Sequence, residues 1–421
     1  MKKLQFNHML ALLSTMTLVA GSQTVYAQQA APEAEEIVVT GFKASLEKAQ
    51  EVKKASSSIV EAIAAEDIGK LPDSSIAESL ARLPGLAGER RDGRTSGLSV
   101  RGFNENYVAT TMNGREILGI GDNRGVEYDL YPSEIISGAT IYKTPDATLV
   151  NQGLGGIVNL STIRPLDHAP VMSVSGNYEQ NDLKSANPDF KDTGHRLAFT
   201  YADKFADDTI GVALSVATME SPSQEQQFRA WGYADVDTNG DGKNDAKAIG
   251  GQDTNVRSSL MKRDTYSGVF QYRPNEKVEV TVDALHIDFN DDKVFRGYEE
   301  GFAWGGGSVN TYGNVVDGLA LTGTTSNFAS VIRNDGDSKD AKLDTYGLNV
   351  KYHLSDEWAL TFDAAMGKSE KDQLDMESYS GVGRSIRWSS YCRATRCFGR
   401  THMDYDIKRC NVFCASNIDP T

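Results

Sequence analysis

The sequence predicts a small α/β domain followed by the first strands of an antiparallel transmembrane β-barrel. Three observations indicate this fold class: an export signal, a change near Pro165 from mixed patterns to strict period-two alternation, and connections that alternate between short and long. They divide the 421-residue chain into a signal peptide at 1–27, a flexible segment at 28–55, an α/β domain at 56–166 and barrel strands with loops at 167–421.

The first 27 residues have the pattern of a secretory signal. Two lysines precede an apolar core from Met9 to Ala20, and Val25-Tyr26-Ala27 has the small-x-small pattern that signal peptidase cuts. The apolar core is too short for a membrane-spanning helix. We therefore expect the mature chain to begin at Gln28.

The composition excludes several classes of protein. With 43 Lys and Arg against 58 Asp and Glu, the formal net charge is −15, which argues against a nucleic-acid partner. No segment after the signal approaches about 18 consecutive apolar residues, so a membrane protein would have to be a barrel. The six histidines are scattered, and the HExxH, P-loop and Gly-x-Ser-x-Gly patterns are absent, so no enzyme activity is expected.

Mixed helix and strand signals between Ser56 and Pro165 predict the α/β domain. A helix is expected from Ile76, capped by Asp73 or Ser74 and stopped by Pro84-Gly85. Asn113-Gly114 supplies a turn between short apolar runs that predict strands. These runs are Leu98–Val100, Tyr107–Met112 and Ile135–Tyr142.

Seven segments after Pro165 alternate with period two, with apolar and aromatic residues on one face and small or polar residues on the other. Each is close to the roughly 9–11 residues of a tilted membrane strand. The alternation alone also fits a soluble sandwich. The segments are Met172–Tyr178, Leu197–Phe205, Ile210–Thr218, Tyr266–Arg273, Val278–Ala284, Tyr346–Tyr352 and Trp358–Met366.

The connections favour the barrel over the sandwich. Short turns at 206–208, 274–276 and 354–357 alternate with long connections, of which about 40 residues lie between Glu220 and Asp264 and more than 50 between Asp288 and Leu343. Outer-membrane barrels sort their connections in this way, because their periplasmic turns are short and their extracellular loops are long.

A short β-prone run, Glu36-Ile37-Val38-Val39-Thr40-Gly41, lies between the signal and the α/β domain. No neighbouring segment offers it a strand to pair with. Further motifs follow in the order Ile68–Asp73, Glu78–Gly85, Val100-Arg101-Gly102, Asn113-Gly114-Arg115, Pro132-Ser133-Glu134 and Gly155–Pro165. In this order and spacing the chain resembles the TonB-dependent outer-membrane receptors over essentially its whole mature length. The run at Glu36 resembles the TonB box, and the α/β domain resembles the plug.

The resemblance implies a set of candidate functional residues in the plug. They are Arg101, Gly102, Asn113, Gly114, Gly155, Gly156, Asn159, Arg164 and Pro165.

The resemblance also implies a 22-stranded barrel in the outer membrane of a Gram-negative bacterium, with the plug and the N-terminus facing the periplasm. Only about seven strands fit before Thr421, so the chain departs from the family here. We expect it to be the N-terminal portion of a larger protein, and its sheet to be open.

The implied function is energised uptake of a scarce nutrient across the outer membrane. The box would pair as an added β-strand with periplasmic TonB, and a pull on it would displace part of the plug. The alternative is that Ile37–Val39 docks as an edge strand of the plug. The run Glu36–Phe42 with Ala44–Ala49 resembles the subgroup associated with oligosaccharide uptake, so a carbohydrate ligand is expected, and a siderophore or other metal chelate is the alternative.

Two other classes of function remain as alternatives. A receptor that signals through a transducer would normally carry a further domain before the box, whereas only eight residues lie between the signal and Glu36. A passive porin or adhesin would need neither a box nor a plug.

Arg101, Arg115 and Arg164 are expected to form ion pairs between the plug and the barrel wall. Acidic residues such as Asp283 and Asp363 point inward in the predicted strand phases and are candidate partners, with the exact pairs left open. The alternative is that these arginines are solvated surface charges.

The segment from Asp237 to Asp245 has the pattern of a calcium loop. Its oxygen ligands would be Asp237, Asn239, Asp241 and Asp245, with Gly242 at the sharp turn. Ala248 stands where the bidentate Glu is expected, and the alternative is a turn without an ion. No cofactor is required, and a structural calcium ion is the metal that the sequence suggests.

The last long loop is expected to contain disulfides, because four cysteines gather there in an exported chain. They are Cys392, Cys397, Cys410 and Cys414. Unpaired thiols are the alternative. Trp231, Trp304 and Trp388 fall in predicted loops, where they would stack on sugar rings or pack the loops themselves.

Overall fold

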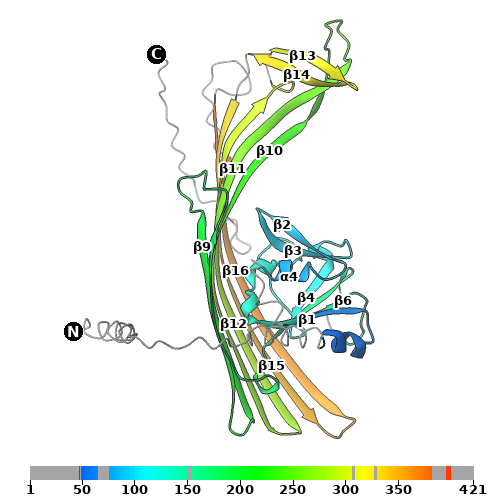
Figure 1. Cartoon of the computed structure of the whole chain (residues 1–421), viewed down its shortest axis with the longest axis vertical. Coiled ribbons are helices and arrows are strands. Elements are labelled where there is room, and N and C mark those ends of the chain that lie inside the picture. Colours follow the sequence, from blue (N-terminus) through cyan, green and yellow to red (C-terminus); the bar gives the residue numbers. More distant parts are fainter. Residues whose placement is uncertain are drawn as a thin grey trace, which may run out of the picture. The chain divides into compact units, whose positions relative to one another are not determined.

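The computed structural model describes residue 47 and residues 49–64, 75–149, 153–305, 309–326, 330–381 and 395–399. They belong to one compact unit, Ala44–Thr421. The predicted signal peptide, the run Glu36–Gly41, the Ile68–Asp73 motif and Trp388 lie outside the described residues. Within them, an α/β domain is followed by antiparallel strands, as the sequence predicts (Figure 1).

The α/β domain is built on a five-stranded sheet in the order β1-β6-β7-β4-β5. Strands β4 and β7 run parallel, and the other neighbours are antiparallel. A separate hairpin, β2–β3, and a short helix, α4, pack beside this sheet. The bounds are β1 Val60–Ala64, α4 Ile76–Leu80, β2 Leu86–Arg91, β3 Arg94–Val100, β4 Val108–Met112, β5 Arg115–Glu116, β6 Ile136–Tyr142 and β7 Gly156–Thr162.

Helix α4 begins at Ile76, as the sequence predicts, but its cap is not one of the two residues that the sequence suggested. Ser75, and neither Asp73 nor Ser74, is the N-cap, and its hydroxyl accepts a hydrogen bond from the backbone N–H of Glu78. Ser75 and Glu78 have capping-box spacing. The helix buries Ile76 and Leu80 completely in the core.

All seven predicted segments are strands of one large sheet, and neighbours in sequence pair antiparallel. Single-turn 3-10 helices connect elements in the α/β domain and lead into the sheet, at Glu105–Tyr107, Tyr128–Leu130, Ser133–Ile135 and Pro165–Asp167. The sheet strands are β8 Val171–Gln180, β9 Thr193–Phe205, β10 Ile210–Val236, β11 Ala246–Asn275, β12 Val278–Gly301, β13 Val309–Val316, β14 Leu319–Ser326, β15 Ser330–His353, β16 Ala359–Glu377, β17 Tyr379–Gly381 and β18 Thr395–Gly399.

The strands are far longer than predicted, and the long connections are correspondingly shorter. Strands β10 and β11 pair almost continuously from Ile210↔Tyr272 to Val236↔Ala246, so most of the predicted loop between Glu220 and Asp264 is strand. The predicted loop before Leu343 likewise contains the end of β12, the hairpin β13–β14 and half of β15. The three short turns lie where they were predicted.

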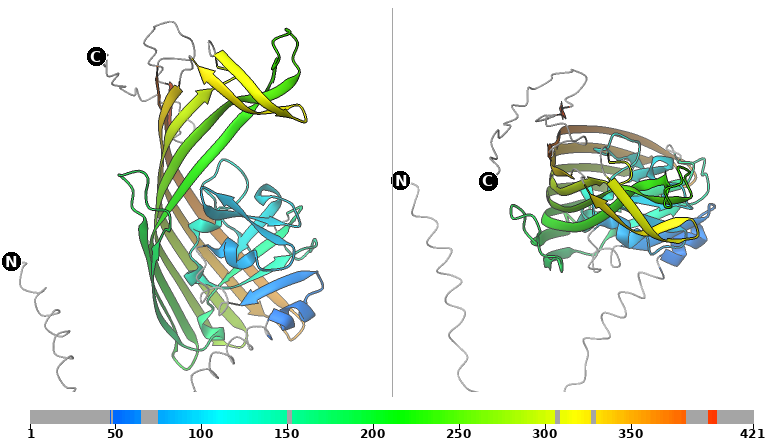
Figure 2. Two further views of the ribbon diagram at one scale, coloured as in Figure 1. Left: turned by 45° about the horizontal axis from the view of Figure 1, so that its top comes forward. Right: turned by 90° about the horizontal axis from the view of Figure 1, so that it is seen from above.

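The large sheet has two chemically different faces. Its outer face carries exposed apolar rows, such as Phe270, Val282 and Leu348, which are paired neighbours on β11, β12 and β15. Its inner face contributes Met261, Ile287 and Leu343 to the same buried core as Leu98 and Val158 of the α/β domain. The α/β domain therefore packs against the concave inner face (Figure 2). No helix in the described ranges is long and apolar enough to cross a membrane.

Candidate functional site

The topology of the small sheet gathers two of the predicted motifs at one place. Met112, the last residue of β4, pairs with Leu160 of the parallel strand β7. The turn Asn113-Gly114-Arg115 therefore lies beside the end of the Gly155–Pro165 motif, where Asn113 Nδ2 donates to Thr162 Oγ1 at 3.1 Å.

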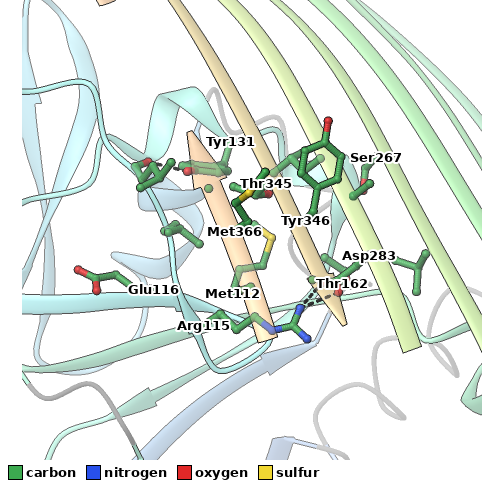
Figure 3. Close-up of a pocket in the computed structure, with 18 residues that line it drawn as sticks. Met112, Arg115, Glu116, Tyr131, Thr162, Ser267, Asp283, Thr345, Tyr346 and Met366 are labelled. Atoms are coloured by element: carbon green, nitrogen blue, oxygen red, sulfur yellow. Dashed lines mark hydrogen bonds and ion pairs between the residues drawn. The ribbon is translucent and has the colours of Figure 1, made fainter. Parts of the chain in front are cut away.

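Arg115 joins the α/β domain to the wall at this point, which we call the lower junction. Its Nη1 lies 2.6 Å from Asp283 Oδ2 on β12, and its Nε lies 2.7 Å from Asp363 Oδ1 on β16. A cavity of about 320 Å³ opens beside it, with Met112, Tyr131 and Met366 among its lining residues (Figure 3). The predicted ion pairs between Arg115 and these two carboxylates are present in the structure.

The two carboxylates hold the Arg115 guanidinium in its charged form. Its hydrogen bonds to Asp363 and then to Asp283 raise the pKa of Arg115 further above its usual range, although burial opposes them. The Arg115 side chain is only 14% exposed. Loss of the guanidinium would therefore leave two like charges facing each other in a partly buried space.

Asn113, Gly114 and Asn159 shape the turn that carries Arg115. Asn113 and Gly114 both adopt positive φ, at 55° and 81°, which is the two-residue hairpin turn predicted from the sequence. Asn159 Oδ1 accepts a hydrogen bond from Gly114 N at 2.9 Å. Asn113 Nδ2 also reaches Asp283 Oδ1 at 3.2 Å, so the turn contacts the wall independently of Arg115.

Arg164 lies near the lower junction without a direct partner among the described residues. Its Nη1 is buried and makes no hydrogen bond there. Burial lowers the pKa of Arg164 below its usual range, while the nearby Asp283 carboxylate opposes that shift. The expected ion pair with the wall is thus absent for Arg164 in the described part of the chain.

The remaining predicted plug residues, Gly155, Gly156 and Pro165, shape the backbone and its packing. Pro165 begins a single 3-10 turn, and the N–H of the next residue, Leu166, donates to Gln271 Oε1 on β11 at 2.9 Å. Gly156 has a φ of 147°, and a Cβ there would lie 2.7 Å from the carbonyl oxygen of Tyr142. A Cβ on Gly155 would clash with Phe103.

Arg101 does not contact the wall, so the prediction for this residue is wrong. It is exposed, and its Nη1 donates to the backbone carbonyl of Lys143 at 2.7 Å within the α/β domain. Arg101 and Gly102 both have positive φ and form a tight turn after β3. The Val100-Arg101-Gly102 motif therefore shapes a turn of the domain.

A second, larger cavity of about 700 Å³ lies on the inner face of β10, β11, β12, β15 and β16. We call it the upper cavity. Its lining holds six carboxylates and four cations, and Phe295 supplies an aromatic surface under Arg257 and Arg333. Each cation already has an acidic partner: Arg229 pairs with Asp253, Arg257 and Lys293 pair with Asp92, and Arg333 pairs with Glu299 and Asp335.

Asp92 contacts the wall, and the sequence interpretation missed this residue. It stands with Gly93 at the tip of the β2–β3 hairpin, where both residues have positive φ. The Asp-Gly dipeptide between two β-prone runs is a strong hairpin signal and would have located the turn. Nothing in the sequence indicates which wall residues the tip meets, because they lie more than 130 positions further along the chain.

The rings of Trp231 and Trp304 lie against glycines of β10 and β11. Trp231 donates from Nε1 to Asp253, a residue of the cavity lining. Trp304 packs against Gly232 and Gly250, where a Cβ would meet its ring, and remains 52% exposed. Trp231 lies in strand β10, and Trp304 in the turn after β12.

The predicted calcium loop connects β10 and β11. Asp237 accepts hydrogen bonds from the backbone N–H groups of Asn239, Gly240 and Gly242, and Asp245 accepts from Thr238. Asp241 accepts from the N–H of Lys243. No group of three or more His, Cys, Asp or Glu side chains that could hold a metal ion is found in the described residues. Calcium binding at this loop stays a prediction.

The predicted disulfides lie largely outside the described residues. Cys397 falls in the short strand β18, whose side chains the structure does not describe, and the other three cysteines lie outside the described ranges.

Residues 52–157 match the family model of the TonB-dependent receptor plug domain. The α/β domain is thus similar to the plug domain of TonB-dependent receptors. The match extends from before β1 to the start of β7, and it includes the hairpin tip at Asp92 and the turn at Arg115.

No curated protein sequence matches the chain. Solved structures that resemble it include the unliganded ferric citrate transporter FecA, at 11% identity and a TM-score of 0.37, over 79% of this chain and 60% of that one. The siderophore receptor PirA from Acinetobacter baumannii has 14% identity and a TM-score of 0.32, over 79% and 57%. A mutant ferric enterobactin receptor PfeA from Pseudomonas aeruginosa has 10% identity and a TM-score of 0.33, over 77% and 58%. The chain thus spans 57–60% of the length of these three structures.

Proposed function

We propose that the chain is part of a TonB-dependent outer-membrane receptor that takes up a scarce nutrient by energised transport. The observation that carries this proposal is a plug domain attached by Arg115 to the inner face of a barrel-type sheet. A plug in this position blocks passive passage along the wall, so transport needs energy to displace it. This supports a receptor and transporter rather than an enzyme, a passive porin or an adhesin.

The energy would reach the plug through the run Glu36–Gly41. An extended segment of this kind can add a strand to a sheet edge of periplasmic TonB through its backbone N–H and C=O groups. This assignment places the plug and the N-terminus on the periplasmic side and the loop at Asp237–Asp245 outside the cell. The exposed apolar rows on the outer face of the sheet would contact the lipids of the outer membrane.

An oligosaccharide is the ligand class we propose. The lining of the upper cavity carries a formal charge of −2, from six carboxylates and four cations, which disfavours anionic ferric chelates. Carboxylates accept hydrogen bonds from sugar hydroxyls, and guanidinium groups donate hydrogen bonds to them. Trp304, held on two glycines and half exposed, offers a ring for stacking, and the resemblance of Glu36–Phe42 to oligosaccharide receptors agrees with this class.

The test is a panel of binding and uptake measurements on the intact receptor. Maltohexaose, xylohexaose and chitohexaose represent neutral sugars, and ferric citrate represents anionic chelates. We expect one sugar to bind saturably and to accumulate only in cells with TonB and an energised inner membrane. Saturable, TonB-dependent uptake of ferric citrate alone would contradict the oligosaccharide assignment, and equal accumulation of a panel member without TonB would contradict energised transport.

A further inference from the structure

The tip of the β2–β3 hairpin is held against the wall by a second set of contacts, which we call the upper junction. Asp92 Oδ1 lies 2.6 Å from Arg257 Nη1 on β11, and Asp92 Oδ2 lies 2.6 Å from Lys293 Nζ on β12. Ser223 Oγ on β10 donates to the backbone carbonyl of Asp92 at 2.8 Å. One residue therefore links the plug to three consecutive wall strands.

Asp92 is also where the plug meets the upper cavity. Of the fifteen residues that line this cavity, only Asp92 belongs to the plug, and the other fourteen lie on the wall or at its end. Arg257 and Lys293 line the cavity as well. A ligand in the cavity can therefore reach the plug directly through Asp92 or through these two cations.

The two cations have other partners that keep them in place if Asp92 leaves. Lys293 Nζ lies 3.1 Å from Asp291 Oδ2 on its own strand, and Arg257 lies over the ring of Phe295 at 5.5 Å. A broken ion pair is costly when it leaves one charge unpaired in a buried space. Release of Asp92 would leave neither cation in that state. The carboxylate itself would face a polar, partly open cavity.

The lower junction depends on a single cation for its ion pairs. Asp283 and Asp363 share Arg115, and their other hydrogen bonds come from the neutral amides of Asn113 and Asn349. Arg115 does not line the upper cavity. The geometry thus combines a lower anchor built on one cation with an upper anchor whose two cations keep other partners, and Arg94 of the same hairpin contacts the Ser221 carbonyl and Asp291 independently of Asp92.

We infer that Asp92 senses occupancy of the upper cavity: a ligand that takes hydrogen bonds from Arg257 and Lys293 releases the hairpin tip and loosens the plug. Sugar hydroxyls would accept from the two cations and donate to the freed carboxylate, so a neutral ligand suffices. The inference rests on the proposed function, because it assigns the upper cavity to the transported ligand.

The first test needs no ligand. Amide hydrogen exchange of residues 86–100 is compared in the intact receptor and in the variants Asp92→Asn and Asp335→Asn. Asp335 is a matched control, because it also lines the cavity and pairs with an arginine, yet it lies wholly on the wall. We expect the exchange rate of the hairpin amides to rise about tenfold in Asp92→Asn, because a charge-assisted hydrogen bond is lost. The rate should stay unchanged in Asp335→Asn. Equal exchange in the two variants would overturn the inference.

The second test adds the sugars and ferric citrate of the panel. Any member that binds saturably should accelerate hairpin exchange in the unmodified receptor and produce no further acceleration in Asp92→Asn. Protection of the hairpin on binding would overturn the sensing role. If ferric citrate binds and accelerates exchange, the result supports the sensing role of Asp92 and contradicts the oligosaccharide ligand. The test therefore distinguishes failure of one proposal from failure of the other.

Discussion

Arg115 and Asp92 attach the plug to the wall with opposite charge arrangements, one cation between two acids and one acid between two cations. The sequence predicted the first, because inward-facing Asp283 and Asp363 follow from strand phase and Arg115 follows a turn motif. It gave no signal for the partners of Asp92, since Arg257 and Lys293 lie in segments without apolar alternation. The same reasoning failed for Arg101, whose positive φ turns it away from the wall.

Replacement of Arg115 by alanine should destabilise the plug by about 3 kcal/mol, the lower end of the range for a broken buried pair, because Asp363 is partly exposed. The measurement is the urea concentration at which trypsin begins to cleave the plug in the intact receptor. Arg101→Ala is the control, and this exposed residue should change stability by no more than about 0.5 kcal/mol. Equal shifts in the two variants would show that the lower junction contributes nothing specific.

The upper junction should weaken in acid. Burial alone would raise the pKa of Asp92, but Lys293 and Arg257 more than offset it, so the pKa lies below its usual range. The Asp92 carboxylate therefore stabilises the junction fully above about pH 4, the ordinary pKa of an aspartate. This stabilisation is lost as the pH falls through the lowered pKa of the folded state. Arg94, Asp291, Arg257 and Lys293 are among the charged groups around it.

The difference in hairpin stability between the unmodified receptor and Asp92→Asn should consequently shrink as pH falls from about 6 to about 3. Hydrogen exchange of residues 86–100, corrected for the intrinsic effect of pH, measures it. A difference that stays constant over this range would contradict the assigned charge pairing.

At the scale of elements, the sequence located seven of the eleven described strands of the large sheet, but mainly the part of each that carries the apolar outer face. Strand β11 illustrates the reason. Around Phe270 the outer side chains are apolar or aromatic, whereas further along the same face Lys262 and Asp264 are exposed charges. The outer face therefore loses its apolar alternation there, although the backbone pairing continues to Ala246. The extensions of β10, β12 and β15 were predicted as loops for the same reason.

Because the outer face of β15 has an apolar part and a polar part, we expect a new positive charge to be destabilising in the first and tolerated in the second. Leu348 pairs with Val282 in an apolar row, whereas Asp340 pairs with Asn290 in a polar row that also contains Lys262 and Asp372. Leu348→Arg should cost about 2–4 kcal/mol in the membrane, because a charge would face lipid. Asp340→Arg, on the same face, should be tolerated. The yield of folded receptor in outer membranes and its urea midpoint measure both.

At the scale of the whole molecule, the plug contacts the inner face through the two junctions and through further ion pairs, such as Arg94 with Asp291 and Arg196 with Glu134, and the run Glu36–Gly41 precedes it in the chain. The predicted order of signal, box-like run, α/β domain and barrel strands is what made the fold class predictable from sequence. The upper cavity was not predictable, because its lining combines residues from five strands and one hairpin that only the register brings together.

The most direct test of energised transport compares Val38→Pro with Val38→Thr in the intact receptor. Proline removes a backbone N–H that pairing with TonB needs, whereas threonine keeps the backbone and its preference for strands. We predict that ligand binding is unchanged in both variants, and that TonB-dependent uptake is abolished in Val38→Pro and retained in Val38→Thr. Undiminished energised uptake by Val38→Pro would contradict the account.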